Sequence, residues 1–110
     1  MIKQLTNFNV STIISTFASL YEKKCWLTTH TDQSYGKIAF VYNLTKNWKE
    51  EYGGNFYLLH DNHTVRKKVI PTFNSLTIFD VSRQEGRPHY VEKVNDNVEE
   101  KRLCFSGWLI

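Results

Sequence analysis

Alternation of apolar and polar residues along most of the chain constrains its fold more than any other feature. It begins after residue 24 and has the period of two that places successive side chains on opposite faces of a β-strand. Turn-forming residues, such as the pair Gly53 and Gly54, separate the alternating stretches. An antiparallel sandwich or barrel is therefore predicted. Its seven expected strands are Cys25–Thr31, Lys37–Leu44, Gly54–Leu59, Val65–Ile70, Ser75–Val81, His89–Val94 and Arg102–Ile110.

The composition agrees with a small β domain. Aromatic residues make up 15% of the 110 residues, and only two prolines are present to interrupt a hydrogen-bonded ladder. A chain of this length buries enough surface for one core. We therefore expect one domain over residues 1–110, in which a helical segment at residues 1–24 precedes a β core at residues 25–110.

One helix is predicted ahead of the β core. Five apolar residues recur at the spacing of an amphipathic helix, and Ser11 precedes them as a capping residue. They are Ile13, Ile14, Phe17, Leu20 and Tyr21. The helix would run over residues 12–23 and pack its apolar face against the outside of the sheet.

The chain lacks the marks of several other classes of protein. No apolar run approaches the roughly 18 residues that span a bilayer, so no membrane contact is expected. The net charge of +3 is too small to indicate nucleic-acid binding. Residues 1–9 lack the apolar segment of a secretory signal, and Cys25 and Cys104 make no disulfide framework. A cytoplasmic location is therefore expected.

Three potential metal ligands fall on or beside predicted strands. His30 and Asp32 are two residues apart, so in extended chain they project from the same face. His89 opens a later strand, and Arg102 opens the one after it. Two histidines and one carboxylate are the ligand set that binds non-haem Fe(II) and leaves coordination positions open. A His-x-Asp sequence alone also fits an ordinary polar strand end, and the order of all four residues favours a site.

Further sequence pieces keep a recognisable order around these residues. The chain from Trp26 to Ile110 resembles the 2-oxoglutarate and Fe(II)-dependent dioxygenases, and within them the prolyl-hydroxylase-like branch. The resemblance implies a double-stranded β-helix, the jelly-roll or cupin-like fold. The pieces that carry it are His30-Thr31-Asp32, the strand at residues 37–44, Trp48, Gly53-Gly54, Pro71-Thr72-Phe73-Asn74, His89-Tyr90-Val91, and Arg102 followed by Gly107-Trp108.

The resemblance also implies an activity and a role for each residue. His30, Asp32 and His89 would bind Fe(II), and Arg102 would bind the side-chain carboxylate of the cosubstrate 2-oxoglutarate. With O2 as the second cosubstrate, the chain would hydroxylate a prolyl residue or another amino-acid substrate. That substrate would be carried on a protein or peptide, or be a small molecule.

The chain departs from the family pattern at the cosubstrate site. Where many relatives have a tyrosine that contacts 2-oxoglutarate, this chain has Asn43, and Tyr42 is one position away. Cys104 stands two residues after Arg102, where a small hydroxyl side chain is common. These three residues are weaker candidates for contacts to the cosubstrate.

The family also usually carries more chain ahead of the His-x-Asp sequence, where this chain has 29 residues. One alternative is therefore a non-catalytic or truncated jelly-roll that binds a metal or a small acid. Another is a subunit that a second copy or a partner chain completes.

Overall fold

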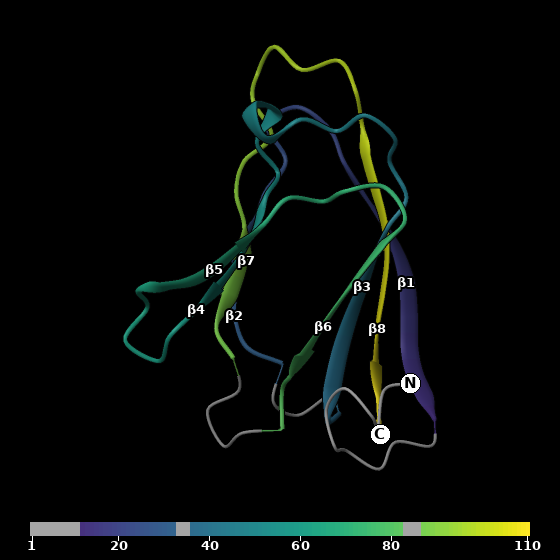
Figure 1. Ribbon diagram of the computed structural model, residues 1–110, viewed down its shortest axis with the longest axis vertical. Helices are drawn as coiled ribbons and strands as arrows, with labels where there is room; N and C mark the ends of the chain where they lie inside the picture. Colours follow the sequence, from purple (N-terminus) through teal and green to yellow (C-terminus); the bar gives the residue numbers. More distant parts are fainter. Residues whose placement is uncertain (1–11, 33–35, 83–86) are drawn as a thin grey trace.

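Two four-stranded antiparallel sheets face each other in the computed structural model, which describes residues 12–32, 36–82 and 87–110 (Figure 1). The major sheet has the order β1-β8-β3-β6, and the minor sheet has the order β2-β7-β4-β5. The strands of the major sheet are β1 (Ile13–Tyr21), β8 (Arg102–Leu109), β3 (Ile38–Asn43) and β6 (Ser75–Asp80). Those of the minor sheet are β2 (Leu27–His30), β7 (His89–Val91), β4 (Phe56–Leu59) and β5 (Val65–Val69).

Each of the seven strands predicted from the alternating pattern is present, and together with β1 they build an arrangement consistent with a jelly-roll. A short 3₁₀ helix, η1 (Glu50–Tyr52), lies in the connection before β4. The basic run at residues 66–68 falls on β5, an edge strand, where exposed charges discourage pairing with another chain.

The prediction of an N-terminal helix over residues 12–23 is wrong. This segment forms β1, which pairs antiparallel with β8, and the described residues contain no helix beyond η1. Ser11, the expected capping residue, lies outside the described residues. No described helix is long and apolar enough to cross a membrane.

A β-bulge explains why β1 has helix-like spacing. Position 14 pairs with position 108 and position 17 with position 106, so β1 contains one extra residue in this interval. Ser15 lies within the bulge at a φ of 52°. The bulge pairs positions 14, 17 and 21 with positions 108, 106 and 102 on one face of β8, although they are three and four residues apart, as on a helix. β-branched residues at 12, 13, 14 and 16 favour the strand.

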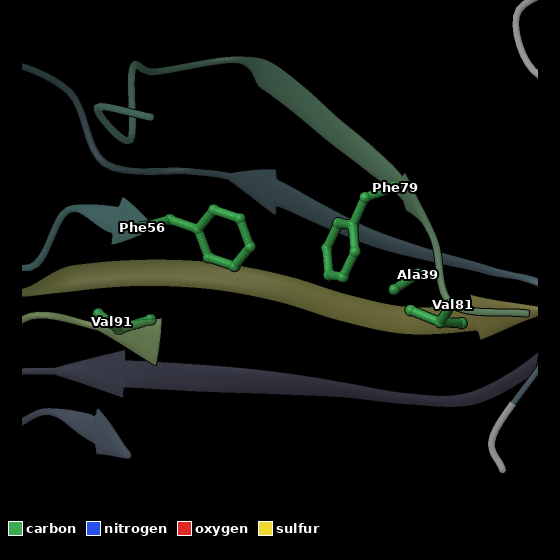
Figure 2. Packing of buried hydrophobic residues seen from close by; sticks show 5 residues of the cluster. All are labelled: Ala39, Phe56, Phe79, Val81 and Val91. Carbon is green, nitrogen blue, oxygen red and sulfur yellow. The ribbon is translucent and has the colours of Figure 1, made fainter. Parts of the chain in front are cut away.

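The core fills the space between the two sheets. Figure 2 shows Phe56 of β4 and Phe79 of β6 projecting toward each other, with Ala39, Val81 and Val91 around them. The two phenyl rings lie 5.4 Å apart between centroids. Because these side chains come from both sheets, their packing sets the distance between the sheets and supports the residues beside them.

Candidate metal centre and carboxylate pocket

His30, Asp32 and His89 converge at one end of the minor sheet. His30 ends β2 and is the register partner of His89, which begins β7. The Asp32 carboxylate lies 3.6 Å from Nε2 of His30 and 3.1 Å from Nε2 of His89. One potential ligand atom from each residue lies within 4.8 Å of the other two. The spacing of His30 and Asp32, together with the pairing of His30 with His89, thus places three potential ligand atoms around one point.

Backbone carbonyls orient both imidazole rings. Nδ1 of His30 lies 2.7 Å from the carbonyl oxygen of Thr28, and Nδ1 of His89 lies 2.6 Å from that of Arg87. A carbonyl only accepts, so in each ring Nδ1 donates a proton and Nε2 is turned toward Asp32. Histidine ligands of metals are commonly held by a second hydrogen bond of this kind.

The three ligands differ in their exposure to solvent. The side chain of His89 is 4% exposed and packs against the rings of Phe56 and Phe79 at centroid distances of 5.5 and 4.9 Å. The side chain of Asp32 is 10% exposed, whereas that of His30 is 34% exposed. The site is therefore closely packed on the side of β7 and open to solvent on the side of β2.

Asp32 is ionised at neutral pH despite its burial. Burial alone would raise the pKa of this carboxyl group, but a hydrogen bond to His89 and the charges of His89 and His30 outweigh it. A smaller contribution comes from the indole of Trp108. The pKa of Asp32 therefore lies below its usual range, and the group presents an anionic oxygen to a cation.

A cavity of about 290 Å³ extends from these residues between the sheets. Its walls come from both sheets, and Arg102 of β8 lines it together with His30, Asp32 and His89. Arg102 is only 2% exposed. Its Nη2 donates to Oδ1 of Asn43 at 3.3 Å, while its Nε and Nη1 have no hydrogen-bond partner among the described residues.

The buried guanidinium of Arg102 is suited to binding an anion in the cavity. Burial lowers the pKa of Arg102, although nearby Cys104 and Tyr21 oppose this effect. Arginine nevertheless keeps its charge in proteins, so the burial is costly unless the free N–H groups find an acceptor. The planar guanidinium matches the geometry of a carboxylate or a phosphate. The cavity therefore offers ligands for a cation and a binding group for a carboxylate.

Comparison with known proteins agrees with this pair of sites. Residues 16–110 match the family described as the 2OG-Fe(II) oxygenase superfamily. The chain belongs to this superfamily. As an oxygenase domain it carries a His-x-Asp and a later His as a candidate iron site. The family implies Fe(II) and 2-oxoglutarate, and the ligand set and the unpartnered nitrogens of Arg102 fit that cation and that dicarboxylate.

Several solved structures share the fold of this oxygenase. A prolyl-4-hydroxylase of Pseudomonas putida is 20% identical with a TM-score of 0.75, over 98% of this chain and 56% of that one. A prolyl hydroxylase of Trichoplax adhaerens, solved with a hypoxia inducible factor peptide, is 21% identical with a TM-score of 0.75, over 96% and 47%. A prolyl 4-hydroxylase of Phytophthora capsici is 17% identical with a TM-score of 0.66, over 97% and 36%.

These similarities establish the fold and no more, because the identities lie at 17 to 21%. The oxygenase chain spans between 36 and 56% of the length of these structures. No curated protein matches the chain.

The three weaker candidates for cosubstrate contacts have different positions in the oxygenase. Tyr42 lies on the outer face of β3, where its hydroxyl bonds to Asn74, so the expected contact from Tyr42 to the pocket is not found. Asn43 faces inward, but it bonds to Arg102 and, through Nδ2 at 3.1 Å, to Ser75. Cys104 lines the cavity, with its sulfur 4.0 Å from the hydroxyl of Ser106.

The sequence reasoning missed Tyr21. This residue ends β1 and pairs with Arg102, with the centroid of its ring 4.9 Å from the guanidinium carbon. A helix over residues 12–23 would have placed it outside the sheet. The alternation of Phe17, Ser19 and Tyr21, all of which line the cavity, is the signal that identifies the segment as a strand.

Proposed function

We propose that this chain is a hydroxylase that uses Fe(II), 2-oxoglutarate and O2 to act on a prolyl residue or another amino-acid substrate. The observation that carries the proposal is the buried guanidinium of Arg102, which shares a cavity with His30, Asp32 and His89. Within the part of the chain that the structure describes, two of its nitrogens have no hydrogen-bond partner. A simple metal-binding protein has no need of a buried cation beside its metal. A dicarboxylate cosubstrate would account for both the candidate metal ligands and the buried Arg102.

Each residue then has a defined task. His30 and His89 would hold iron through Nε2, and Asp32 would hold it through its carboxylate. Arg102 would bind the distal carboxylate of 2-oxoglutarate and so fix the cosubstrate in one orientation. The bound iron, 2-oxoglutarate and O2 would supply the oxidation that introduces a hydroxyl group. The apolar wall formed by Phe56, Phe79 and Val91 would exclude water from this end of the cavity.

The prolyl-like substrate is supported by the fold of three prolyl hydroxylases. Substrate choice depends on side chains around the mouth of a site more than on the fold itself. Other amino-acid substrates therefore belong to the same proposal, and a panel of peptides decides between them.

Anaerobic titration with Fe(II) and 2-oxoglutarate tests the proposal. A visible charge-transfer band is expected when both are added to the wild-type chain. His89→Ala should remove the band, because it deletes the most buried ligand of the set. His60→Ala, an exposed residue in the loop between β4 and β5, is the matched control and should retain it. A folded wild-type chain that gives no band would contradict the proposal.

A turnover assay distinguishes an active oxygenase from a non-catalytic binding module. We expect the wild-type chain to form succinate in air and to add one oxygen atom to a prolyl peptide, as detected by mass spectrometry. Formation of the band without succinate would identify the chain as a non-catalytic module that binds metal and a small acid.

A further inference from the structure

A row of paired residues crosses the minor sheet from the candidate metal ligands to the edge strand β5. His30 pairs with His89. Leu58 of β4 pairs with His89 on one side and with Lys67 of β5 on the other. Leu58 packs against the core between the sheets, and residues directly opposite each other on paired strands project from the same face. Lys67 therefore extends from the inner face of the minor sheet, the face that carries the two histidines.

Exposure to solvent increases along this row from β7 to β5. The side chain of His89 is 4% exposed, Leu58 is partly buried, and Lys67 is exposed. β5 lies at the edge of the minor sheet, and Figure 1 shows the hairpin of β4 and β5 extending outward from the sheets. The row thus leads from the candidate iron site, across an apolar side chain, to a cation in solvent.

Two adjacent lysines of β5 differ in what they contact. Lys68 pairs with Tyr57 on the outer face, and its Nζ lies 2.8 Å from a carboxylate oxygen of Glu50. Lys67 makes neither an ion pair nor a hydrogen bond with any residue that the structure describes. The ammonium group of Lys67 is therefore available to an anionic group of a ligand at the mouth of the cavity.

The spacing of the strands fixes which part of a ligand could reach this ammonium group. Neighbouring strands lie about 4.8 Å apart, so β5 is about 10 Å from β7. An extended peptide advances about 3.3 Å per residue and covers that distance in about three residues. The flexible stem of a lysine shortens the distance that the peptide has to cover. A side chain about two or three positions from a residue at the candidate iron site would therefore lie within reach of Lys67.

We propose that Lys67 selects peptide substrates that carry an acidic side chain about two or three residues from the residue that is hydroxylated. This inference rests on the proposed function and names a class of substrate for the same site. Charge complementarity supports it, because a carboxylate would pair with the unpaired ammonium group whereas a basic side chain would be repelled. A solvent-exposed ion pair contributes modestly to affinity, so Lys67 sets a preference among peptides.

The test compares three peptides on four proteins. The peptides share one sequence with a central proline and differ at one position, which is Glu, Gln or Lys. One set is made for each placement of that position, two or three residues to either side of the proline. The proteins are the wild type, Lys67→Met, Lys67→Glu and the control Lys68→Met, which removes the neighbouring positive charge from the outer face of the same strand. Peptide affinity is measured by anaerobic calorimetry with Fe(II) and 2-oxoglutarate present, and kcat/KM for hydroxylation is measured in air.

In at least one placement the wild type should bind the Glu peptide about threefold more tightly than the Gln peptide, and the Lys peptide more weakly than either. Lys67→Met should bind all three with the same affinity, and Lys67→Glu should favour the Lys peptide. Lys68→Met should keep the wild-type order. The kcat/KM values should follow the affinities, and added salt should reduce the preference because the pair is exposed.

Three results would overturn the inference. The first is equal affinity of the wild type for the three peptides in every placement. The second is a preference for the Glu peptide that Lys67→Met retains, or that Lys68→Met loses to the same extent as Lys67→Met. The third is a wild-type chain that gives the charge-transfer band with Fe(II) and 2-oxoglutarate but binds none of the peptides. A chain that gives no band overturns the proposed function and this inference together, and the band distinguishes that outcome from the other three. Thermal unfolding of each variant shows that it is folded.

Discussion

Arg102 is the residue on which the candidate site depends most. An isolated cation in a protein interior is unfavourable, and burial is tolerated when charge and hydrogen bonds are compensated. In this chain Tyr21 covers one face of the guanidinium and Asn43 accepts from one nitrogen. Two nitrogens remain for a ligand. A bound carboxylate would therefore complete the hydrogen bonding of the Arg102 guanidinium.

Arg102→Lys should weaken the binding of 2-oxoglutarate and leave Fe(II) binding nearly unchanged. An ammonium cannot reproduce the planar arrangement of N–H donors, and losing one charge-assisted hydrogen bond lowers affinity by about ten- to a hundredfold. Calorimetry under anaerobic conditions measures both ligands. Arg66→Lys on the exposed strand β5 is the control and should bind both as the wild type does. Unchanged affinity for 2-oxoglutarate in Arg102→Lys would remove Arg102 from the site.

Replacing Arg102 with an apolar residue should raise the free energy of unfolding of the metal-free chain. Arg102→Met replaces a buried, incompletely paired cation with an apolar chain of similar length. Such replacements often raise the free energy of unfolding, by about 1–4 kcal/mol. Urea denaturation in the absence of metal and cosubstrate measures the change. A free energy of unfolding that falls by several kcal/mol would show that the guanidinium is already satisfied in the metal-free chain.

A local sequence rule predicted that His30 and Asp32, two of the candidate metal ligands, lie on one side of the chain, because the rule depends only on alternation along extended chain. His30 and Asp32 share a side of extended chain whatever the rest of the fold. His89 joins them because it pairs with His30 across β2 and β7. The same alternation places Tyr42 and Asn43 on opposite faces of β3. It cannot say which of the two reaches the cavity, because that depends on how β3 pairs with β8. The contact of Tyr21 with Arg102 was missed for a related reason, since it depends on pairing across the sheet.

At the scale of elements, β1 shows how a bulge can give a strand the residue spacing of a helix. One extra residue between positions 14 and 17 changes the spacing of apolar residues from two to three. A periodicity count then indicates a helix, although the β-branched residues favour a strand. The seven other strands contain enough unbroken alternation to be recognised, and each is found near its predicted position. The turn chemistry that separates them was equally informative, as Gly53 illustrates.

Gly53→Ala should destabilise the turn between η1 and β4. Gly53 has a φ of 80°, and a Cβ at this position would lie 2.3 Å from the carbonyl oxygen of Lys93. The strain of the left-handed conformation and the clash with backbone should together lower the free energy of unfolding by about 2 kcal/mol or more.

Urea denaturation measures this loss. Asn47→Gly is the control: Asn47 is exposed and has a φ of 61°, a conformation that glycine adopts without strain. Its free energy of unfolding should change by less than about 0.5 kcal/mol. A Gly53→Ala variant as stable as the wild type would show that the turn can move away from Lys93.

At the scale of the whole molecule, the candidate site joins the two sheets. The minor sheet carries His30 and His89, and the major sheet carries Tyr21 and Arg102. The core between the sheets, shown in Figure 2, therefore fixes the distance from the candidate iron site to the candidate carboxylate site. The two faces of β8 have opposite character. Arg102 and Cys104 face the cavity, whereas Leu103 and Phe105 are exposed on the outer face.

The outer face of the major sheet carries neighbouring apolar side chains that solvent reaches. Leu20 and Leu103 are register partners and are 54% and 38% exposed. Phe105 and Leu76 both pair with Tyr42 and are 40% and 43% exposed. Monomeric soluble proteins rarely leave a large contiguous apolar patch in contact with water. We therefore expect this face to drive association of the chain with itself.

The double substitution Leu103→Lys and Phe105→Lys should reduce that association. Light scattering over a range of concentrations should give the wild type a mass above that of one chain and the double variant a mass near one chain. Its affinity for 2-oxoglutarate should not change, because the neighbouring Arg102 points to the other side of β8. Val65→Lys, at an apolar residue that is 53% exposed on β5, is the control and should associate as the wild type does. A wild-type chain with the mass of a single chain at every concentration would show that the outer face stays exposed to solvent and does not cause self-association.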